Sequence, residues 1–77
     1  MKDCLKKILM ERYGIEVWFS YLDFECTMIY LDAIKENLDI VLKLLDACNI
    51  TVYSYDISED LKDMDKLVWH IGVEVLE

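Results

Sequence analysis

The sequence lacks proline altogether and has only two glycines, Gly14 and Gly72. No Pro- or Gly-rich stretch marks a linker, and 77 residues are the size of one domain, so we expect a single domain over residues 1–77. No run of uncharged residues reaches the length that a membrane-spanning helix requires. The chain also opens without the apolar run of a standard secretion signal, which favours a cytoplasmic location and no membrane partner.

Positive charge is scarce as well. The chain has 8 Lys and Arg residues against 16 Asp and Glu residues, which gives a net charge of −8. Direct nucleic-acid binding depends on clustered Lys and Arg side chains that contact phosphates, so this class of function is not expected. Disorder is not expected either, because 56% of the residues are hydrophobic and 12% are aromatic. We therefore expect an acidic globular protein.

The usual residue patterns of catalysis are missing. His70 is the only histidine, and no second ligand lies at the short spacing typical of a zinc site. The three cysteines, Cys4, Cys26 and Cys48, form no Cys-x-x-Cys pair. The sequence has neither a glycine-rich phosphate loop nor a nucleophile elbow. We therefore predict that the protein is not an enzyme and has no catalytic, cofactor-binding or metal-binding residues.

One acidic segment partly matches a calcium-binding loop. Asp56, Ser58 and Asp60 stand at the first, third and fifth positions of such a loop. Leu61 and Leu67 replace the glycine and the final glutamate that the loop requires. An EF-hand is therefore excluded, and a weak divalent-cation site in a solvated loop stays as an alternative.

Hydrophobic periodicity predicts two helices and four strands. The first helix covers residues 2–13 and ends at Gly14, and the second covers residues 33–48, with Asp32 as its N-cap. The second helix carries an apolar core stripe made of Ile34, Leu38, Val41, Leu42 and Leu45. The strands are expected at residues 15–21, 24–31, 50–57 and 67–76, with residues 58–66 as a loop or a short helical turn.

These elements follow the order α-β-β-α-β-β, which belongs to the α+β class. The order is that of a ferredoxin-like sandwich, β-α-β-β-α-β, cut after its third strand and joined at its old ends. We then expect a four-stranded antiparallel sheet in the order first, second, fourth, third, with both helices on one face. Strand 67–76 takes an inner position because it is bulky on both faces. The alternative is two sequential hairpins around one helix.

The second face of such a sheet would be open. We expect it to carry Trp18, Ile29, Tyr53 and Tyr55, or else the residues of opposite parity. Tyr and Trp are enriched at interfaces between proteins, and carboxylates stand in the same strands and beside them. The predicted partner-binding residues are Glu16, Trp18, Asp23, Glu25, Tyr53, Tyr55, Asp56, Glu59, Asp60, Asp63 and Asp65.

A net charge of −8 favours association with a basic protein surface. Such surfaces belong above all to proteins that bind nucleic acids. We therefore predict a small acidic binding protein that mimics nucleic acid. Inhibitors, antitoxins, immunity proteins and phage anti-defence proteins act in this way.

Self-association is the alternative function. A chain of this size buries only about 63% of its unfolded surface, and its apolar content exceeds what such a core hides. A homodimer is therefore expected. The alternative reading is a homo-oligomeric regulatory or structural module that binds a small ligand or Ca²⁺.

Overall fold

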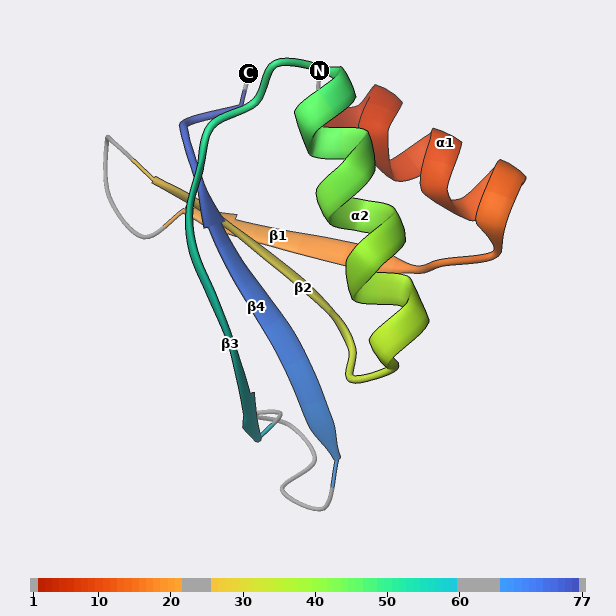
Figure 1. Ribbon diagram of the computed structural model, residues 1–77, viewed down its shortest axis with the longest axis vertical. Helices are drawn as coiled ribbons and strands as arrows, with labels where there is room; N and C mark the ends of the chain where they lie inside the picture. Colours follow the sequence, from red (N-terminus) through yellow and green to blue (C-terminus); the bar gives the residue numbers. More distant parts are fainter. Residues whose placement is uncertain (1, 22–25, 60–65, 77) are drawn as a thin grey trace.

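The computed structural model describes residues 2–21, 26–59 and 66–76 (Figure 1). The order α-β-β-α-β-β and the α+β class are confirmed. The elements are α1 (Lys2–Tyr13), β1 (Val17–Tyr21), β2 (Thr27–Asp32), α2 (Lys35–Ala47), β3 (Val52–Glu59) and β4 (Leu67–Val73). In the described part of the chain, neither helix is long and apolar enough to cross a membrane.

The four strands form one antiparallel sheet in the order β1-β2-β4-β3. This is the predicted order, and the alternative of two sequential hairpins is wrong. β4 lies inside the sheet, where it pairs with β2 on one side and with β3 on the other. α2 connects β2 to β3 and so crosses β4, which lies between them. β1 and β3 are therefore the two edges of the sheet.

Both helices lie on the same face of the sheet, as predicted (Figure 1). Leu31 of β2 pairs with Val17 of β1 and with Trp69 of β4, and directly paired residues point to the same face. This register brings apolar side chains of neighbouring strands together beneath the helices. The core consists of Leu5, Leu9, Ile15, Val17, Ile29, Leu31, Leu38, Val41, Leu45, Ile50, Ile71, Val73 and Leu76.

The strand register also corrects the expected open face. Trp18 pairs with Tyr30, so Ile29 points to the opposite face and is fully buried beneath the helices. Tyr55 pairs with Ile71, which also pairs with Ile29, so Tyr55 lies on the helix side too. Only Trp18 of these three residues lies on the open face. The prediction was wrong about which residues of different strands share a face. That depends on the pairing register between strands, which the sequence of one strand does not specify.

The start of α2 differs from the prediction, because Asp32 is not its N-cap. Asp32 is still part of β2, where it pairs with Val68, and its carboxylate lies 2.8 Å from Lys66 Nζ. The β2–β4 ladder therefore holds Asp32 in extended conformation, away from the helix. The residue before α2 is Ile34, which makes no side-chain cap hydrogen bond and is 49% exposed instead of lying in the core stripe.

Both helices end at residues with left-handed backbone. Gly14 has φ 65° and donates its N–H to Met10 O at 3.1 Å, while Ile15 N donates to Leu9 O at 3.0 Å. Asn49 has φ 59° after α2. Glycine and asparagine tolerate this conformation better than other residues, so each chain turn follows directly from the residue type at that position.

One buried polar side chain holds the C-terminal segment. Thr27 is fully buried, and its Oγ1 accepts the backbone N–H of Leu76 at 3.1 Å. The carbonyl of Leu76 accepts the Tyr21 hydroxyl at 2.9 Å, and Lys2 Nζ donates to the same hydroxyl at 3.0 Å. The segment after β4 is thus fixed through both backbone groups of Leu76, whose side chain lies in the core.

We predict that Thr27→Val destabilises the protein by about 1–3 kcal/mol, because it leaves the buried Leu76 N–H without its acceptor while the side-chain volume is kept. The matched control is Thr51→Val, at an exposed position, which should change the free energy of unfolding by less than about 0.5 kcal/mol. Urea denaturation measures both values. Equal effects of the two substitutions would contradict the role of the Thr27 hydroxyl.

Candidate functional site

The predicted partner-binding residues do not form one surface. Glu16 and Trp18 lie at β1, at one edge of the sheet, with β2 and β4 between them and the opposite edge. The members at that opposite edge, in β3, are Tyr53, Tyr55, Asp56 and Glu59. The remaining members lie outside the described residues and are Asp23, Glu25, Asp60, Asp63 and Asp65. The two edges are therefore separate candidate surfaces.

At the β1 edge, Trp18 belongs to a cluster on the open face that is already paired within the chain. Its ring stacks on Tyr30, with centroids 6.5 Å apart and an interplanar angle of 16°. Lys66 Nζ lies 5.9 Å from the Trp18 ring centroid, and it also contacts Asp32. Lys66 therefore already contacts the Trp18 ring and the Asp32 carboxylate, which are the groups that a cation of a basic partner would bind.

Glu16 lies in surroundings of mixed charge. It is exposed and lines a pocket of about 380 Å³ beside α1. The other residues that line this pocket are Asp3, Lys6, Lys7, Met10 and Glu11. The lysines offset the carboxylates, so this edge offers no uniformly negative surface.

β3 forms a longer and more exposed edge. It has 8 residues and continues through Glu59. Residues 58 and 59, which were predicted as part of a loop or a short helical turn, therefore belong to the strand and pair with Val68 and Leu67. Tyr53, Tyr55 and Ile57 are 58%, 54% and 42% exposed. A register irregularity lies between Val52 and Ser54. We call the outer side of residues 52–59 the β3 edge.

Hydrogen bonds determine which backbone groups of β3 point outward. Ala33 N donates to Leu67 O, so the backbone groups of alternate β4 residues from Leu67 onward face β2, and those between them face β3. The residues of β3 whose backbone groups bond to β4 are consequently Ser54, Asp56 and Ser58, which lie opposite Gly72, His70 and Val68. The N–H and C=O groups of Tyr55, Ile57 and Glu59 then point away from the sheet.

The side chain of Asp56 supports this assignment. The N–H of Ile57 donates to Asp56 Oδ1 at 2.8 Å, so a carboxylate, and not β4, receives this outward donor. Among the described residues, no strand pairs with the outer side of β3, because the sheet order ends there. The β3 edge thus presents a row of backbone N–H and C=O groups, and the Asp56 carboxylate accepts a hydrogen bond from one of them, the Ile57 N–H.

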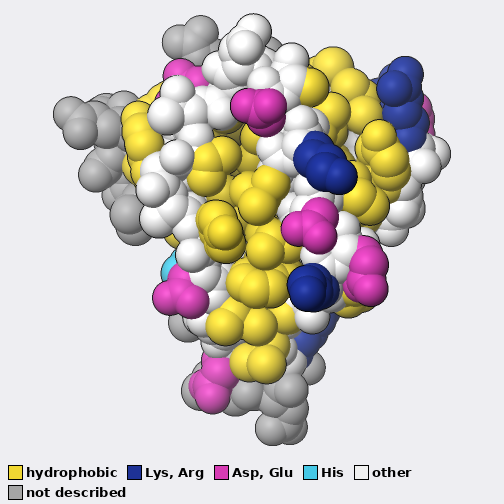
Figure 2. All heavy atoms as spheres, in the orientation of Figure 1, with side chains coloured by type: hydrophobic (Ala, Val, Ile, Leu, Met, Phe, Trp, Pro, Cys, Tyr) yellow, Lys and Arg dark blue, Asp and Glu magenta, His cyan; other side chains and the backbone are white. Residues whose placement is uncertain are grey.

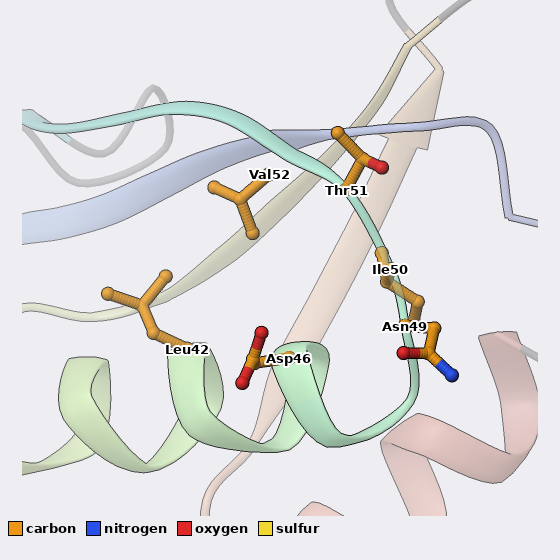
Figure 3. Close-up of a pocket in the computed structure, with 6 residues that line it drawn as sticks. All are labelled: Leu42, Asp46, Asn49, Ile50, Thr51 and Val52. Carbon is orange, nitrogen blue, oxygen red and sulfur yellow. The ribbon is translucent and has the colours of Figure 1, made fainter.

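A groove lined by both apolar and polar side chains lies beside this edge on the helix side of the sheet. A pocket of about 370 Å³ opens between α2 and the segment that leads into β3. In Figure 3, Leu42 of α2 and Val52 of β3 face one another across it, and the Asp46 carboxylate points from α2 into the same gap. Tyr55 and Ile57 continue the apolar side of β3 away from the pocket.

Figure 2 shows apolar side chains as a band between α2 and β3. Lys and Arg side chains alternate with carboxylates on the α2 side of the band, whereas on the β3 side the charged side chains in view are acidic. The sequence has no Lys or Arg between Lys43 and Lys62. Within the described ranges, Asp46, Asp56 and Glu59 take part in no ion pair. Among residues 2–21, 26–59 and 66–76, no ion pair therefore neutralises the carboxylates of the β3 edge.

Sequence reasoning missed two parts of this site. It placed Leu42 in the core stripe, but the residue is only half-buried and lines the groove. It also left out Ile57, although its position two residues after Tyr55 puts both side chains on one face of an extended strand. The groove itself depends on where α2 lies relative to β3, which no local pattern specifies.

The partial calcium-loop match forms no cation site in the part of the chain that the structure covers. No group of three or more His, Cys, Asp or Glu residues there comes together to hold a metal ion. Asp56 uses its carboxylate on the Ile57 N–H, and Ser58 pairs with Val68 in the sheet. Asp60 lies outside the described residues.

Comparison with known proteins gives no relative: no family model, no curated protein and no solved structure matches the chain. Its function is therefore inferred from the β3 edge, the groove beside it and the charge around it. Of the surfaces described, this is the one that combines unpaired backbone groups, exposed aromatic rings and uncompensated carboxylates.

We predict that Asp56→Asn keeps the fold and the local hydrogen bond, because the amide oxygen still accepts the Ile57 N–H. Asp56→Ala removes the acceptor, so the Ile57 amide should exchange with solvent about three to ten times faster than in the wild type. Amide hydrogen exchange by NMR measures this difference. Unchanged exchange in Asp56→Ala would show that another acceptor holds the Ile57 N–H.

Proposed function

We propose that the protein is a small acidic binding protein whose β3 edge occupies the basic, nucleic-acid-binding surface of a target protein. Inhibitors, antitoxins, immunity proteins and phage anti-defence proteins act in this manner. The observation that supports the proposal is the β3 edge itself, an exposed edge strand in which Asp56 and Glu59 form no ion pair with another described residue. A net charge of −8 would steer such a chain toward a positive cleft.

The aromatic residues of the edge fit the same role. Tyr53 and Tyr55 are more than half exposed and belong to the same strand as Asp56. Tyrosine contributes large contact areas at interfaces and keeps a hydroxyl for the solvated rim. Carboxylates supply attraction and orientation, while the rings and the apolar side chains of Leu42 and Val52 in the groove supply the buried area that charge alone does not provide.

A second candidate, a homodimeric regulatory or structural module, is favoured by the sheet face opposite the helices. That face carries Trp18, Met28 and Tyr30, all half-buried and without a covering helix. Two copies that pack these faces together would bury them. Analytical ultracentrifugation at micromolar concentration separates this candidate from the first, because a monomer is expected if the face is not a dimer interface.

To test the main proposal, the tagged chain is incubated at low and high salt with a nuclease-treated lysate of the cells in which the protein occurs. The edge variant is Asp56→Asn with Glu59→Gln, and the matched control is Glu36→Gln with Asp39→Asn on the exposed side of α2. Both variants remove two negative charges. We expect one basic protein to bind the wild type and the control in stoichiometric amount at low salt, and to be released at high salt.

The edge variant should associate with that partner about ten times more slowly, since both removed charges lie in the contact surface. Surface plasmon resonance with the purified partner measures the association rate. Equal loss in both variants would mean that only net charge matters and that β3 is not the contact. Recovery of the chain alone at every salt concentration would favour the homodimer.

A further inference from the structure

We infer that the β3 edge binds an extended segment of the partner as a fifth strand of the sheet, and that this segment alternates apolar and basic residues. The inference rests on the proposed function, because it names the chemistry of the partner at the same edge. It follows from three features of β3: its outward backbone groups, its apolar helix side and the charge of Asp56.

The backbone supplies the first requirement of strand addition. The N–H and C=O groups of Tyr55, Ile57 and Glu59 point outward and lie at the end of the sheet order. An extended peptide can exchange hydrogen bonds with every second residue of such an edge. With 8 residues, β3 is long enough for several of these bonds. β1 has only 5 residues, so β3 offers the longer template.

The helix side of β3 sets the apolar half of the pattern. Side chains of an added strand lie beside those of β3 on the same face. On the helix side these neighbours are Tyr55 and Ile57, which are 54% and 42% exposed, and Glu59 at the end of the strand. Leu42 and Val52 face each other across the groove and continue this apolar surface, while the Asp46 carboxylate points into the same gap. The residues of the incoming segment that lie opposite Tyr55 and Ile57 are therefore apolar.

The open side of β3 sets the basic half of the pattern. Asp56 lies there between Ser54 and Ser58 in a strand whose side chains alternate between faces. In the free protein, its carboxylate accepts the Ile57 N–H that an added strand needs. Strand addition therefore detaches this carboxylate from the backbone. A Lys or Arg on the incoming strand gives it a new partner, whereas an apolar or acidic strand leaves it uncompensated.

The same carboxylate disfavours a second copy as the occupant. Two β3 strands placed edge to edge would bring two sets of Asp56 and Glu59 together, on chains that each carry a net charge of −8. The sequence around β3 offers no lysine or arginine to compensate them, since none lies between Lys43 and Lys62. Charged residues on edge strands are a common protection against self-pairing. Charge complementarity thus favours a basic partner strand.

The test uses synthetic peptides with the length of β3, in which lysine and valine alternate and both ends are capped. One form carries N-methyl groups on all valines, and a second carries them on all lysines. Each methyl group removes one backbone donor, and the two forms carry equal numbers of methyl groups. In an added strand, backbone groups on alternate residues face β3, so only one of the two forms keeps its inward donors.

The sheet is antiparallel throughout, so we expect the valines to lie opposite Tyr55 and Ile57 and to supply the inward donors. Fluorescence anisotropy should give a dissociation constant at least about tenfold higher for the valine-methylated form than for the lysine-methylated form. The peptide should also slow amide exchange at Tyr55, Ile57 and Glu59. Asp56→Asn should weaken peptide binding several-fold, and the Glu36→Gln/Asp39→Asn control should not.

The outcomes distinguish this inference from the proposed function. Equal binding of the two methylated forms, with the same dependence on Asp56 and Glu59, would overturn strand addition and leave recognition by charge intact. Absence of peptide binding together with capture of a basic partner through the same carboxylates would also overturn it. Protection of the Ile57 amide in a wild-type dimer, without peptide, would assign the edge to a second copy. Failure of both the peptide and the lysate experiment would overturn both proposals.

Discussion

The position of β4 between β2 and β3 is the constraint on which the rest of the structure depends. β4 is the last strand of the chain, yet it pairs along both sides with strands that α2 has already connected. Ile71 of β4 lies opposite Ile29 of β2 and Tyr55 of β3, and it is fully buried in the core. The helices cover the face formed by β1, β2 and β4, and β3 extends beyond them (Figure 1). The exposed edge is thus a consequence of the same topology that builds the core.

Much of this fold was predictable because it depends on local signals. The first helix has the predicted bounds, 2–13, since its apolar face and Gly14 act within a few residues. The inner position of β4 followed from its bulk on both faces. The failures concern relations between elements. Asp32 has the chemistry of an N-cap but is held in β2 by pairing with β4. Ile29 was expected on the open face but lies on the helix side, because the pairing register decides which residues share a face.

The candidate site was predictable to a smaller degree. Residue type alone put Asp56, Glu59, Tyr53 and Tyr55 among the predicted partner-binding residues, because carboxylates and tyrosines suit such contacts wherever they are exposed. It did not separate them from Glu16 and Trp18, which lie across the sheet. Nor did it show that Asp56 covers a backbone donor, since that contact depends on which groups of β3 face outward. A carboxylate that both charges and shields an edge is recognised only once the hydrogen-bond ladder is known.

The hydrogen bonds of Tyr21 determine how the protein would be oriented relative to a domain attached to either terminus. Its hydroxyl links Lys2, near the start of the chain, to Leu76, near the end, so both termini leave the protein at one pole (Figure 1). β3 runs from the neighbourhood of that pole toward the opposite one. A tether or a fused domain at either end would therefore attach at this pole. Tyr55, Ile57 and Glu59 would then lie toward the opposite pole, away from the attached domain.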